Sequence, residues 1–281
     1  MERPDPRIGS EQHRTITSTF RSSDGEGYEL QMGRWSRRLA PLFIRFAGTT
    51  GALRVLDVGC GTGNLGLCLA HHPAIVNVRG VDISPSYVEY AKRRNGDSRL
   101  DFQVADACAL PFSDALFDHS LSMLVLQFIP QADLAVREMR RVTRRGGTVA
   151  AATWDTRGGL VAVRMIYDTG AMLDQHGRDA RAAAFTRSMS RPGDLERAWH
   201  QAGLADVVQD MLTIRMDFAS FADFWAPIEG TEGPVAEYVT SLDPDVQVRL
   251  REVVRLAYLD GEADGSRSYA ATAWVVRGRV P

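Results

Sequence analysis

Alternating glycines form the first segment of the chain with an evident chemical use. Gly59, Gly61 and Gly63 occur in the stretch VLDVGCGTG, directly after a short apolar run. Glycine lets a chain turn sharply and lets a ligand lie against bare backbone, whose amides then face it. A tight turn without a ligand would explain one glycine but explains three at this spacing poorly. The pattern therefore predicts a ligand-binding loop between a strand and a helix.

The glycines alone do not identify the ligand. Gly61, Gly63 and Gly66 also satisfy a dinucleotide fingerprint, which leaves a nicotinamide- or flavin-dependent oxidoreductase open. Asp57 argues against that reading, because it stands just before the first glycine, where its charge would oppose a pyrophosphate. A carboxylate at this place suits a cationic ligand.

Two more acidic residues follow the next two expected strands. Asp82, in the stretch GVDI, comes roughly twenty residues after the glycines, where an acid can accept hydrogen bonds from both hydroxyls of a ribose. Asp82 would serve a dinucleotide or a cationic ligand that contains a ribose, so it does not distinguish them. A helix-capping role before Ser84 is the alternative. Asp106, in VADA, ends the third strand, where its side chain and the next backbone amide can contact an adenine edge. Its alternative role is to open a turn.

Alternating strands and helices are expected to position these loops. The apolar pattern predicts strands at 54–58, 78–83, 100–105, 117–123 and 148–153, and helices at 36–46, 65–70, 85–94 and 132–143, the last ended by Gly146 and Gly147. Short connections between such elements are typical of a parallel sheet with helices on both faces.

The alternation breaks down after Trp154. Helices are predicted at 160–176, 192–202, 220–226, 235–242 and 246–259, and strands at 205–216 and 268–277. We therefore expect an α/β fold: a Rossmann-like, doubly wound, mostly parallel seven-stranded sheet with inserted helices forming a lid. The expected organisation is a flexible tail (1–24), a core (25–156), lid insertions (157–203 and 217–262) and the last two core strands (204–216 and 268–277).

The composition excludes several classes of protein. The net charge of −2 and the absence of a basic cluster argue against nucleic-acid binding. No apolar run is long enough to span a bilayer, and the polar first residues lack the core of a signal peptide, so a cytoplasmic protein is expected. Cys60, Cys68 and Cys108 are too scattered for a metal site or a disulfide framework. A monomer and a homodimer both remain open.

Four segments together resemble the class I S-adenosylmethionine (SAM)-dependent methyltransferases, and most of all their UbiE-like, type 11 branch. The segments are VLDVGCGTGNLG, VRGVDISPSYVEYAKRR, VADACALPFSDALFDHSLSMLVLQFIP and MRRVTRRGGTVAAATW, and they agree in order and spacing over about residues 28–154. The resemblance implies SAM as the cofactor, S-adenosylhomocysteine (SAH) as its product, and a small, fairly apolar acceptor.

The resemblance also assigns residues to the cofactor. The implied contacts are Tyr28, Arg34, Asp57, Gly59, Gly61, Gly63, Asp82, Ile83, Asp106, Ala107, Ser122 and Met123. Ile83 would pack on the adenine, and Arg34 would grip the SAM carboxylate while Tyr28 closes over the cofactor. A surface arginine is the alternative for Arg34. Relatives often carry a histidine near Gln127, so this chain lacks one candidate base.

Methyl transfer from a sulfonium needs an aligned acceptor and the exclusion of water, and it needs a base only when the acceptor must lose a proton. Tyr167 and His176, both on the first inserted helix, are the candidate bases. Gln127, Phe224 and Trp225 are candidate acceptor contacts, and burial of the lid is the alternative role of the two aromatic residues. A module that binds SAM or SAH without catalysis remains a second hypothesis.

Overall fold

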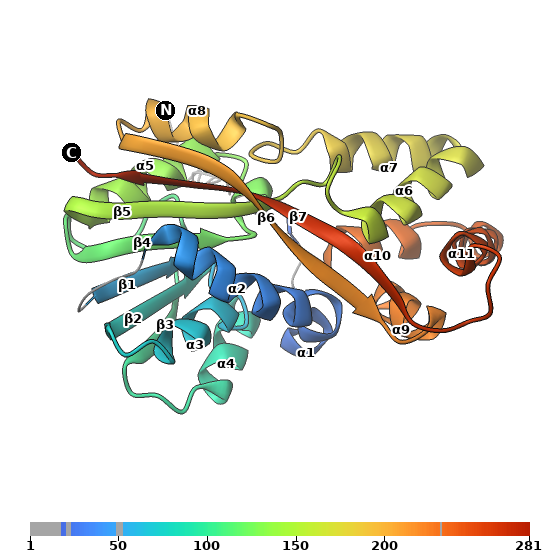
Figure 1. Cartoon of the computed structure of the whole chain (residues 1–281), viewed down its shortest axis with the longest axis horizontal. Coiled ribbons are helices and arrows are strands. Elements are labelled where there is room, and N and C mark those ends of the chain that lie inside the picture. Colours follow the sequence, from blue (N-terminus) through green and yellow to red (C-terminus); the bar gives the residue numbers. More distant parts are fainter. Residues whose placement is uncertain (1–17, 21–23, 49–52, 231) are drawn as a thin grey trace, which may run out of the picture.

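The computed structural model describes residues 18–20, 24–48, 53–230 and 232–281, which form one seven-stranded sheet beneath a group of helices (Figure 1). The strands are β1 (Leu53–Val58), β2 (Ile75–Asp82), β3 (Leu100–Val104), β4 (Phe117–Met123), β5 (Thr143–Trp154), β6 (Ala205–Phe218) and β7 (Arg267–Arg279). Their order is β3-β2-β1-β4-β5-β7-β6. Pairs among β1 to β5 are parallel, and β7 runs antiparallel to β5 and β6. The expected mostly parallel, doubly wound sheet is confirmed.

Helices cover both faces of this sheet. Those on one face are α2 (Arg34–Ala47), α3 (Asn64–Ala70) and α4 (Pro85–Arg94), and those on the other are α5 (Ala132–Val142) and α8 (Asp194–Gln201). Consecutive residues of a strand point to opposite faces. Val55 therefore joins the core beneath α2 and α3, whereas Leu56 joins the core beneath α5 and α8.

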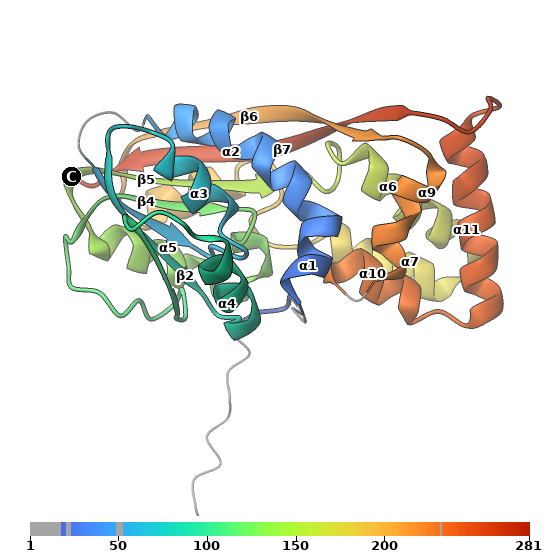
Figure 2. The ribbon, with the colours of Figure 1, turned by 90° about the horizontal axis from the view of Figure 1, so that it is seen from below.

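The remaining longer helices gather beyond one end of the sheet, as Figure 2 shows. They are α6 (Val161–Leu173), α7 (Gln175–Phe185), α9 (Phe221–Trp225), α10 (Gly233–Thr240) and α11 (Pro244–Leu259), and we call them the lid. The long strands β6 and β7 extend from the sheet to the lid. Helix α8 falls within the first expected insertion, yet it packs on the sheet through the fully buried Trp199, whose Nε1 donates to the Val149 carbonyl at 2.9 Å.

Two helix boundaries differ from the prediction. Helix α5 ends at Val142, and β5 begins at once, because Thr143 already pairs with Phe117 of β4. Gly147 lies within that strand, where a Cβ atom would come within 2.5 Å of the Asp118 carbonyl oxygen. The glycine is therefore needed for close strand packing and does not end a helix.

The helix expected over 160–176 is two helices. Helix α6 ends at Leu173, and the Asp174 side chain then caps α7 by accepting a hydrogen bond from the Gly177 amide at 2.6 Å. His176 consequently lies in the first turn of α7 and not at the end of α6.

Part of the expected tail is anchored to the turn that follows β4. Residues 1–17 and 21–23 lie outside the described residues. Thr19, however, donates its backbone amide to the Phe128 carbonyl at 2.8 Å, so residues 18–20 do not form a loose tail. Within the described ranges, no helix combines the length and the apolar character that crossing a bilayer demands.

Candidate functional site

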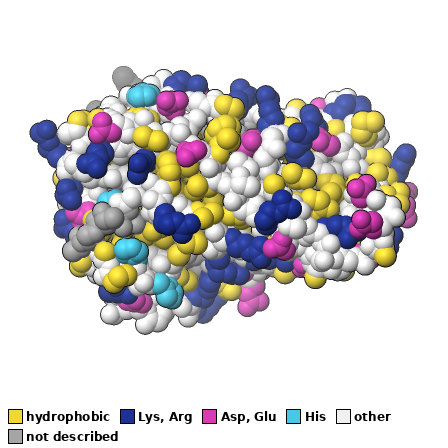
Figure 3. Space-filling view, in the orientation of Figure 1, with side chains coloured by type: hydrophobic (Ala, Val, Ile, Leu, Met, Phe, Trp, Pro, Cys, Tyr) yellow, Lys and Arg dark blue, Asp and Glu magenta, His cyan; other side chains and the backbone are white. Residues whose placement is uncertain are grey.

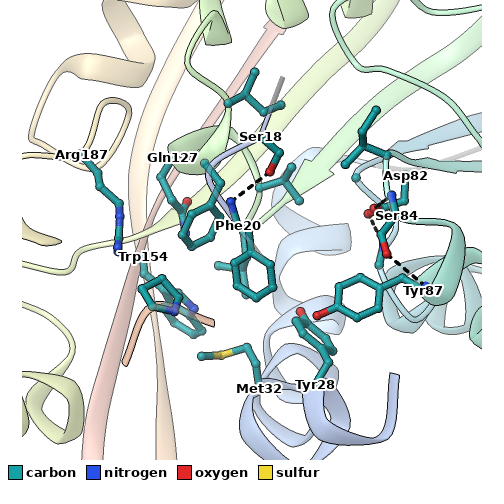
Figure 4. A pocket seen from close by; sticks show the side chains of 18 of the residues that line it. Ser18, Phe20, Tyr28, Met32, Asp82, Ser84, Tyr87, Gln127, Trp154 and Arg187 are labelled. Carbon is teal, nitrogen blue, oxygen red and sulfur yellow. Dashed lines mark hydrogen bonds between the residues drawn. The ribbon is translucent and has the colours of Figure 1, made fainter. Parts of the chain in front are cut away.

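A cavity that opens to solvent lies between the carboxyl ends of the parallel strands and the lid (Figure 4), and its empty space, open solvent included, is about 1240 Å³. The loops after β1, β2 and β3 contribute to one side, and α6 and α10 contribute to the other. The sequence-predicted site residues that line this main cavity are Tyr28, Gly59, Gly61, Asp82, Ile83, Asp106, Ala107, Gln127 and Tyr167. Parallel strands end at a common edge of a sheet, which explains how residues so distant in sequence converge.

The three glycines of the loop have different physical roles. Gly59 and Gly63 have φ of +72° and +88°, and added Cβ atoms would approach Val125 to 2.5 Å and Phe102 to 3.1 Å. Gly61 also has a positive φ, of +52°, but a Cβ atom there would meet nothing within 4 Å. Gly59, which lines both cavities, and Gly63, which lines neither, therefore allow close packing of the loop, whereas Gly61 keeps space open at the cavity wall.

Asp82 is held in place by the backbone around the cavity. One carboxylate oxygen accepts a hydrogen bond from the Gly61 amide at 2.8 Å, and the other accepts from the Ser84 amide at 2.9 Å. Burial raises the pKa of this carboxyl group. The neighbouring Ile83 side chain is 43% exposed, although it is large and apolar. An oriented carboxylate therefore stands beside open apolar surface.

Asp106 both opens a turn and lines the cavity. Its Oδ1 accepts a hydrogen bond from the Cys108 amide at 2.8 Å, and its carbonyl accepts from the Ala109 amide at 3.1 Å. Ala107, the next residue, lines the cavity as well. The two roles considered for Asp106 are thus compatible.

Asp57 lines a second, smaller cavity that adjoins the main one. This small cavity is lined by Tyr28, Ser36, Asp57, Gly59, Cys60, Thr62, Asn64, Leu65 and Met123. The Asp57 side chain is 1% exposed, and its Oδ2 has no hydrogen-bond partner among the described residues. Burial, assisted by the charge of Asp82, raises the pKa of Asp57 to about 7. A buried carboxylate oxygen without a partner is costly and suits a ligand that brings a donor or a positive charge.

Glu29 ties the N-terminal segment to the glycine loop, a link that the sequence analysis missed. It belongs to a π-helical turn, Glu29–Gly33, between α1 (Gly25–Tyr28) and α2. Its Oε1 accepts hydrogen bonds from Asn64 Nδ2 at 2.8 Å and Arg94 Nη1 at 2.9 Å, and from the Thr62 hydroxyl. The polar residues beside the glycines were the only local signal of this network. The network therefore fixes the loop at the wall of the small cavity, which Thr62 and Asn64 line.

Arg34 lies at neither cavity, contrary to the expectation that it grips the cofactor carboxylate. Its Nη1 donates to Asp223 Oδ1 at 2.9 Å, and its guanidinium lies over the Trp35 ring, 4.3 Å from the centroid. Asp223, at the start of α9, supplies the anion that Arg34 was expected to find in a ligand. Figure 3 shows basic and acidic side chains interspersed over the face that α2, β6 and β7 present.

Phe224, Trp225 and His176 do not line the main cavity either. Phe224 and Trp225 are 3% and 2% exposed, and they pack with Phe221 and Tyr258 inside the lid. The structure thus favours the alternative that they bury the lid. His176 Nε2 lies 2.9 Å from the Ser241 hydroxyl, outside the cavity. Ser122 is fully buried in β4 and lines neither cavity.

Several further residues that line the main cavity were not predicted from the sequence. They are Met32, Leu124, Val125, Ile129, Trp154, Thr156, Leu160, Val163, Arg187, Pro234 and Val235. The i, i+3, i+7 spacing of Leu160, Val163 and Tyr167 was a usable signal, because it places all three on one face of a helix. Most of these side chains are apolar.

Aromatic rings lie beside Asp82 on the opposite side. The Tyr28 and Tyr87 centroids are 5.3 Å apart, and Phe20 is 6.4 Å from each. Tyr28 lines both cavities, and its ring also contacts protein, so its closing over a cofactor stays a prediction. Among the described residues, no group of His, Cys, Asp and Glu is arranged to hold a metal ion.

Comparison with known proteins identifies part of the chain. Residues 56–151 match the Methyltransf_11 family model, which is described as a methyltransferase domain. These residues form a methyltransferase domain. The resemblance drawn from the four sequence motifs is therefore confirmed for this part of the chain, and the domain contains Asp57, Asp82 and Asp106.

Individual curated relatives match only part of this chain. An uncharacterized protein of Mycobacterium tuberculosis is 33% identical over 147 residues, or 51% of this chain and 53% of that protein. The ubiquinone/menaquinone biosynthesis C-methyltransferase UbiE of Geobacter sp. is 33% identical over 128 residues, or 44% and 53%. The chain thus spans about half the length of the curated relatives it matches.

A solved structure extends the similarity of fold beyond the matched domain. The phosphoethanolamine N-methyltransferase 2 of Haemonchus contortus, in complex with SAH and phosphomonomethylethanolamine, aligns with a TM-score of 0.57 and 18% identity. The alignment covers 92% of this chain and 57% of that chain. At this level of identity the similarity concerns the fold alone.

Proposed function

We propose that the chain is a SAM-dependent methyltransferase that transfers a methyl group to a small-molecule acceptor. The buried Asp57 carboxylate carries this proposal, because its Oδ2 has no partner among the described residues and lies beside the glycine loop. The ligand that suits it must bring positive charge or N–H donors into an enclosed space. The ammonium of SAM does so, whereas the pyrophosphate of a nicotinamide cofactor would be repelled.

The main cavity suits the adenosyl part of the same ligand. The two oriented oxygens of Asp82 can accept hydrogen bonds from two ribose hydroxyls, and Ile83 offers apolar surface to an adenine ring. Asp106 and the Ala107 amide border the same space. Gly61 leaves room where any side chain would intrude.

When bound, SAM supplies a methyl group that its sulfonium has already activated. The chain must then orient the acceptor in line with that methyl and exclude water. The lid can do both, because Val163 of α6, Leu160 just before that helix and Val235 of α10 line the cavity wall. A cavity that is partly covered by a lid suits a small acceptor better than a nucleic acid.

The acceptor must react without strong help from a base. The described residues that line the main cavity include no histidine, lysine or cysteine, and its two carboxylates, Asp82 and Asp106, are assigned to the cofactor. Tyr167 lines it, but burial raises the pKa of its hydroxyl, so it remains protonated near neutral pH and can donate a hydrogen bond. We therefore propose an acceptor whose attacking atom is already nucleophilic near pH 7. The same lack of a base favours a non-catalytic SAM- or SAH-binding module as the second candidate.

Turnover and binding assays separate these candidates. The purified chain is incubated with SAM and a metabolite library, SAH formation is measured, and products are identified by mass. Asp82→Asn should weaken SAM binding roughly a hundredfold, since it disturbs several hydrogen bonds to a charged group. Asp101→Asn is the matched control, because Asp101 is an exposed carboxylate on β3 paired with Arg79.

Each outcome of these assays has a definite meaning. SAH formation with a methylated product, lost in Asp82→Asn and kept in Asp101→Asn, supports the enzyme. Tight SAM binding without SAH from any acceptor supports the module. Calorimetry that detects no SAM binding, or NADH that displaces it, contradicts the proposal.

A further inference from the structure

Several buried polar groups without partners line the end of the main cavity nearest the lid. Trp154 Nε1, Thr156 Oγ1 and Gln127 Oε1 have no hydrogen-bond partner among the described residues. The three residues are only 4%, 7% and 5% exposed. A native protein contains few such atoms, because each costs about 1–3 kcal/mol when left unpaired. Their presence around one cavity indicates the polar contacts of a ligand.

A positive charge lines the same part of the cavity. Arg187, from the segment between α7 and α8, reaches the cavity and packs over the Phe128 ring, 5.3 Å from its centroid. No carboxylate within the described ranges forms an ion pair with it. The guanidinium also lies close enough to Tyr167 to affect the pKa of its hydroxyl. Arg187 is therefore a partly buried cation with no ion-pair partner among the described residues.

These polar groups belong to one region of the cavity. Figure 4 shows Arg187, Gln127 and Trp154 on one side and Asp82, Ser84 and Tyr87 on the other. Thr156 is held near Trp154, since its amide donates to the Trp154 carbonyl at 3.0 Å. The region is therefore separate from the part assigned to the ribose and adenine.

We propose that the acceptor carries a carboxylate on an apolar body, and that Arg187, Trp154 and Thr156 bind this carboxylate. The proposal rests on the proposed methyltransferase function and names the chemical class of its acceptor. The indole N–H, the hydroxyl and the guanidinium are all donors, and a carboxylate has lone pairs for each of them. The lid contributes apolar wall to the same cavity through Leu160, Val163 and Val235.

The charge balance favours a carboxylate over a phosphate or an amine. Arg187 is the one cation that lines the described part of this cavity, so it can neutralise a single negative charge. A phosphate dianion would retain an uncompensated charge in an apolar wall, and an ammonium would be repelled. The unpaired Gln127 oxygen remains available to a hydroxyl or amine elsewhere on the acceptor.

Binding to the SAH-loaded protein tests this assignment without requiring turnover. The probes are matched sets in which an octyl, phenylbutyl or naphthylmethyl body ends in a carboxylate, a primary amide or an ammonium. Calorimetry gives the affinity of each probe for the wild type, Arg187→Met, Trp154→Phe and Thr156→Val. Arg191→Met is the control, because Arg191 is an exposed arginine four positions along the chain that lines neither cavity.

We expect carboxylates to bind the wild type at least about tenfold more tightly than the matched amides and ammonium compounds. Arg187→Met should remove this preference, Trp154→Phe and Thr156→Val should each reduce it several-fold, and Arg191→Met should retain it. SAH affinity should be unchanged in all four variants. Equal affinity for the three end groups, an unchanged preference in Arg187→Met, or no carboxylate binding would overturn the assignment. Failure of SAH itself to bind the wild type would instead contradict the proposed function.

Discussion

The Tyr87 hydroxyl donates a hydrogen bond to Glu232 Oε2 at 2.5 Å and so joins the methyltransferase domain to the lid. Tyr87 belongs to α4, and Glu232 immediately precedes α10. Glu232 is 1% exposed, and its Oε1 also accepts from the Asp24 amide at 2.8 Å. The buried Glu232 carboxylate therefore connects three segments beside the main cavity: the residues before α1, helix α4 and the start of α10.

Removing the Tyr87 hydroxyl should loosen the lid. Tyr87→Phe keeps the ring but leaves a buried carboxylate oxygen with one donor fewer, which typically costs about 1.5–3 kcal/mol. We expect faster amide hydrogen exchange in α10 and an SAH dissociation rate about tenfold higher. Tyr90→Phe on the same helix is the control, because the Tyr90 ring packs against Gly25, Arg93 and Arg94 while its hydroxyl makes no hydrogen bond among the described residues. Unchanged exchange in Tyr87→Phe would show that the bond does not hold the lid.

The elevated pKa of Asp57 should make SAM binding depend on pH. Because burial raises this pKa to about 7, the carboxyl group is largely neutral in more acidic solution and must lose a proton to pair with an ammonium. SAM affinity should therefore fall by up to tenfold per pH unit below about pH 7. Calorimetry in buffers of different ionisation enthalpy should detect proton release on binding, approaching one proton per SAM at low pH.

The same carboxyl group should lower the stability of the ligand-free protein as pH rises. The folded chain binds the Asp57 proton more tightly than the unfolded chain, whose aspartates titrate near pH 4, so stability falls between about pH 4 and about pH 7. Asp57→Asn should remove this part of the pH dependence and the proton release together. If the pH dependence of stability and the proton release both persisted in Asp57→Asn, another titratable group would be responsible for them.

Local signals predicted much of the fold. Helix 85–94 has the predicted bounds, since Ser84 caps it by accepting from the Tyr87 amide at 3.3 Å and Pro85 occupies its first turn. Strand 117–123 also has the predicted bounds, although Asp118, His119, Ser120 and Ser122 are polar and all seven of its residues are buried. For the helix, the determinants lie within a few residues of the element.

The parts of the site that were missed depend on contacts between residues far apart in the chain. Asp223 stands 189 positions from Arg34, and Glu232 stands 145 positions from Tyr87. No local pattern shows that an expected ligand contact is satisfied by a distant acid. Trp154 is a related case, because the missing partner of its indole N–H is evident only once the surrounding residues are in place.

The glycines of the loop should respond differently to substitution. Gly61→Ala places a methyl group in open cavity space, so it should lower SAM affinity at least about tenfold while costing only the 1–2 kcal/mol of a left-handed alanine. Gly63→Ala incurs the same backbone cost and also presses on Phe102 and Ala91, at 3.1 and 3.2 Å, which adds about 1–3 kcal/mol. Urea unfolding should therefore show the larger loss of stability in Gly63→Ala, and SAM titration should show the larger loss of affinity in Gly61→Ala.

Arg34→Met should affect stability and leave cofactor affinity nearly unchanged. The variant loses a partly exposed ion pair with Asp223 and the stacking on Trp35, together worth about 1 kcal/mol after allowance for solvent screening. Asp223→Asn should produce a similar loss, and the double variant should lose less than the sum, because the two residues stabilise each other. SAM affinity within about twofold of the wild type in all three is expected, since neither side chain lines a cavity. A drop of a hundredfold in Arg34→Met alone would mean that the arginine leaves Asp223 to bind the cofactor carboxylate, as the sequence resemblance had implied.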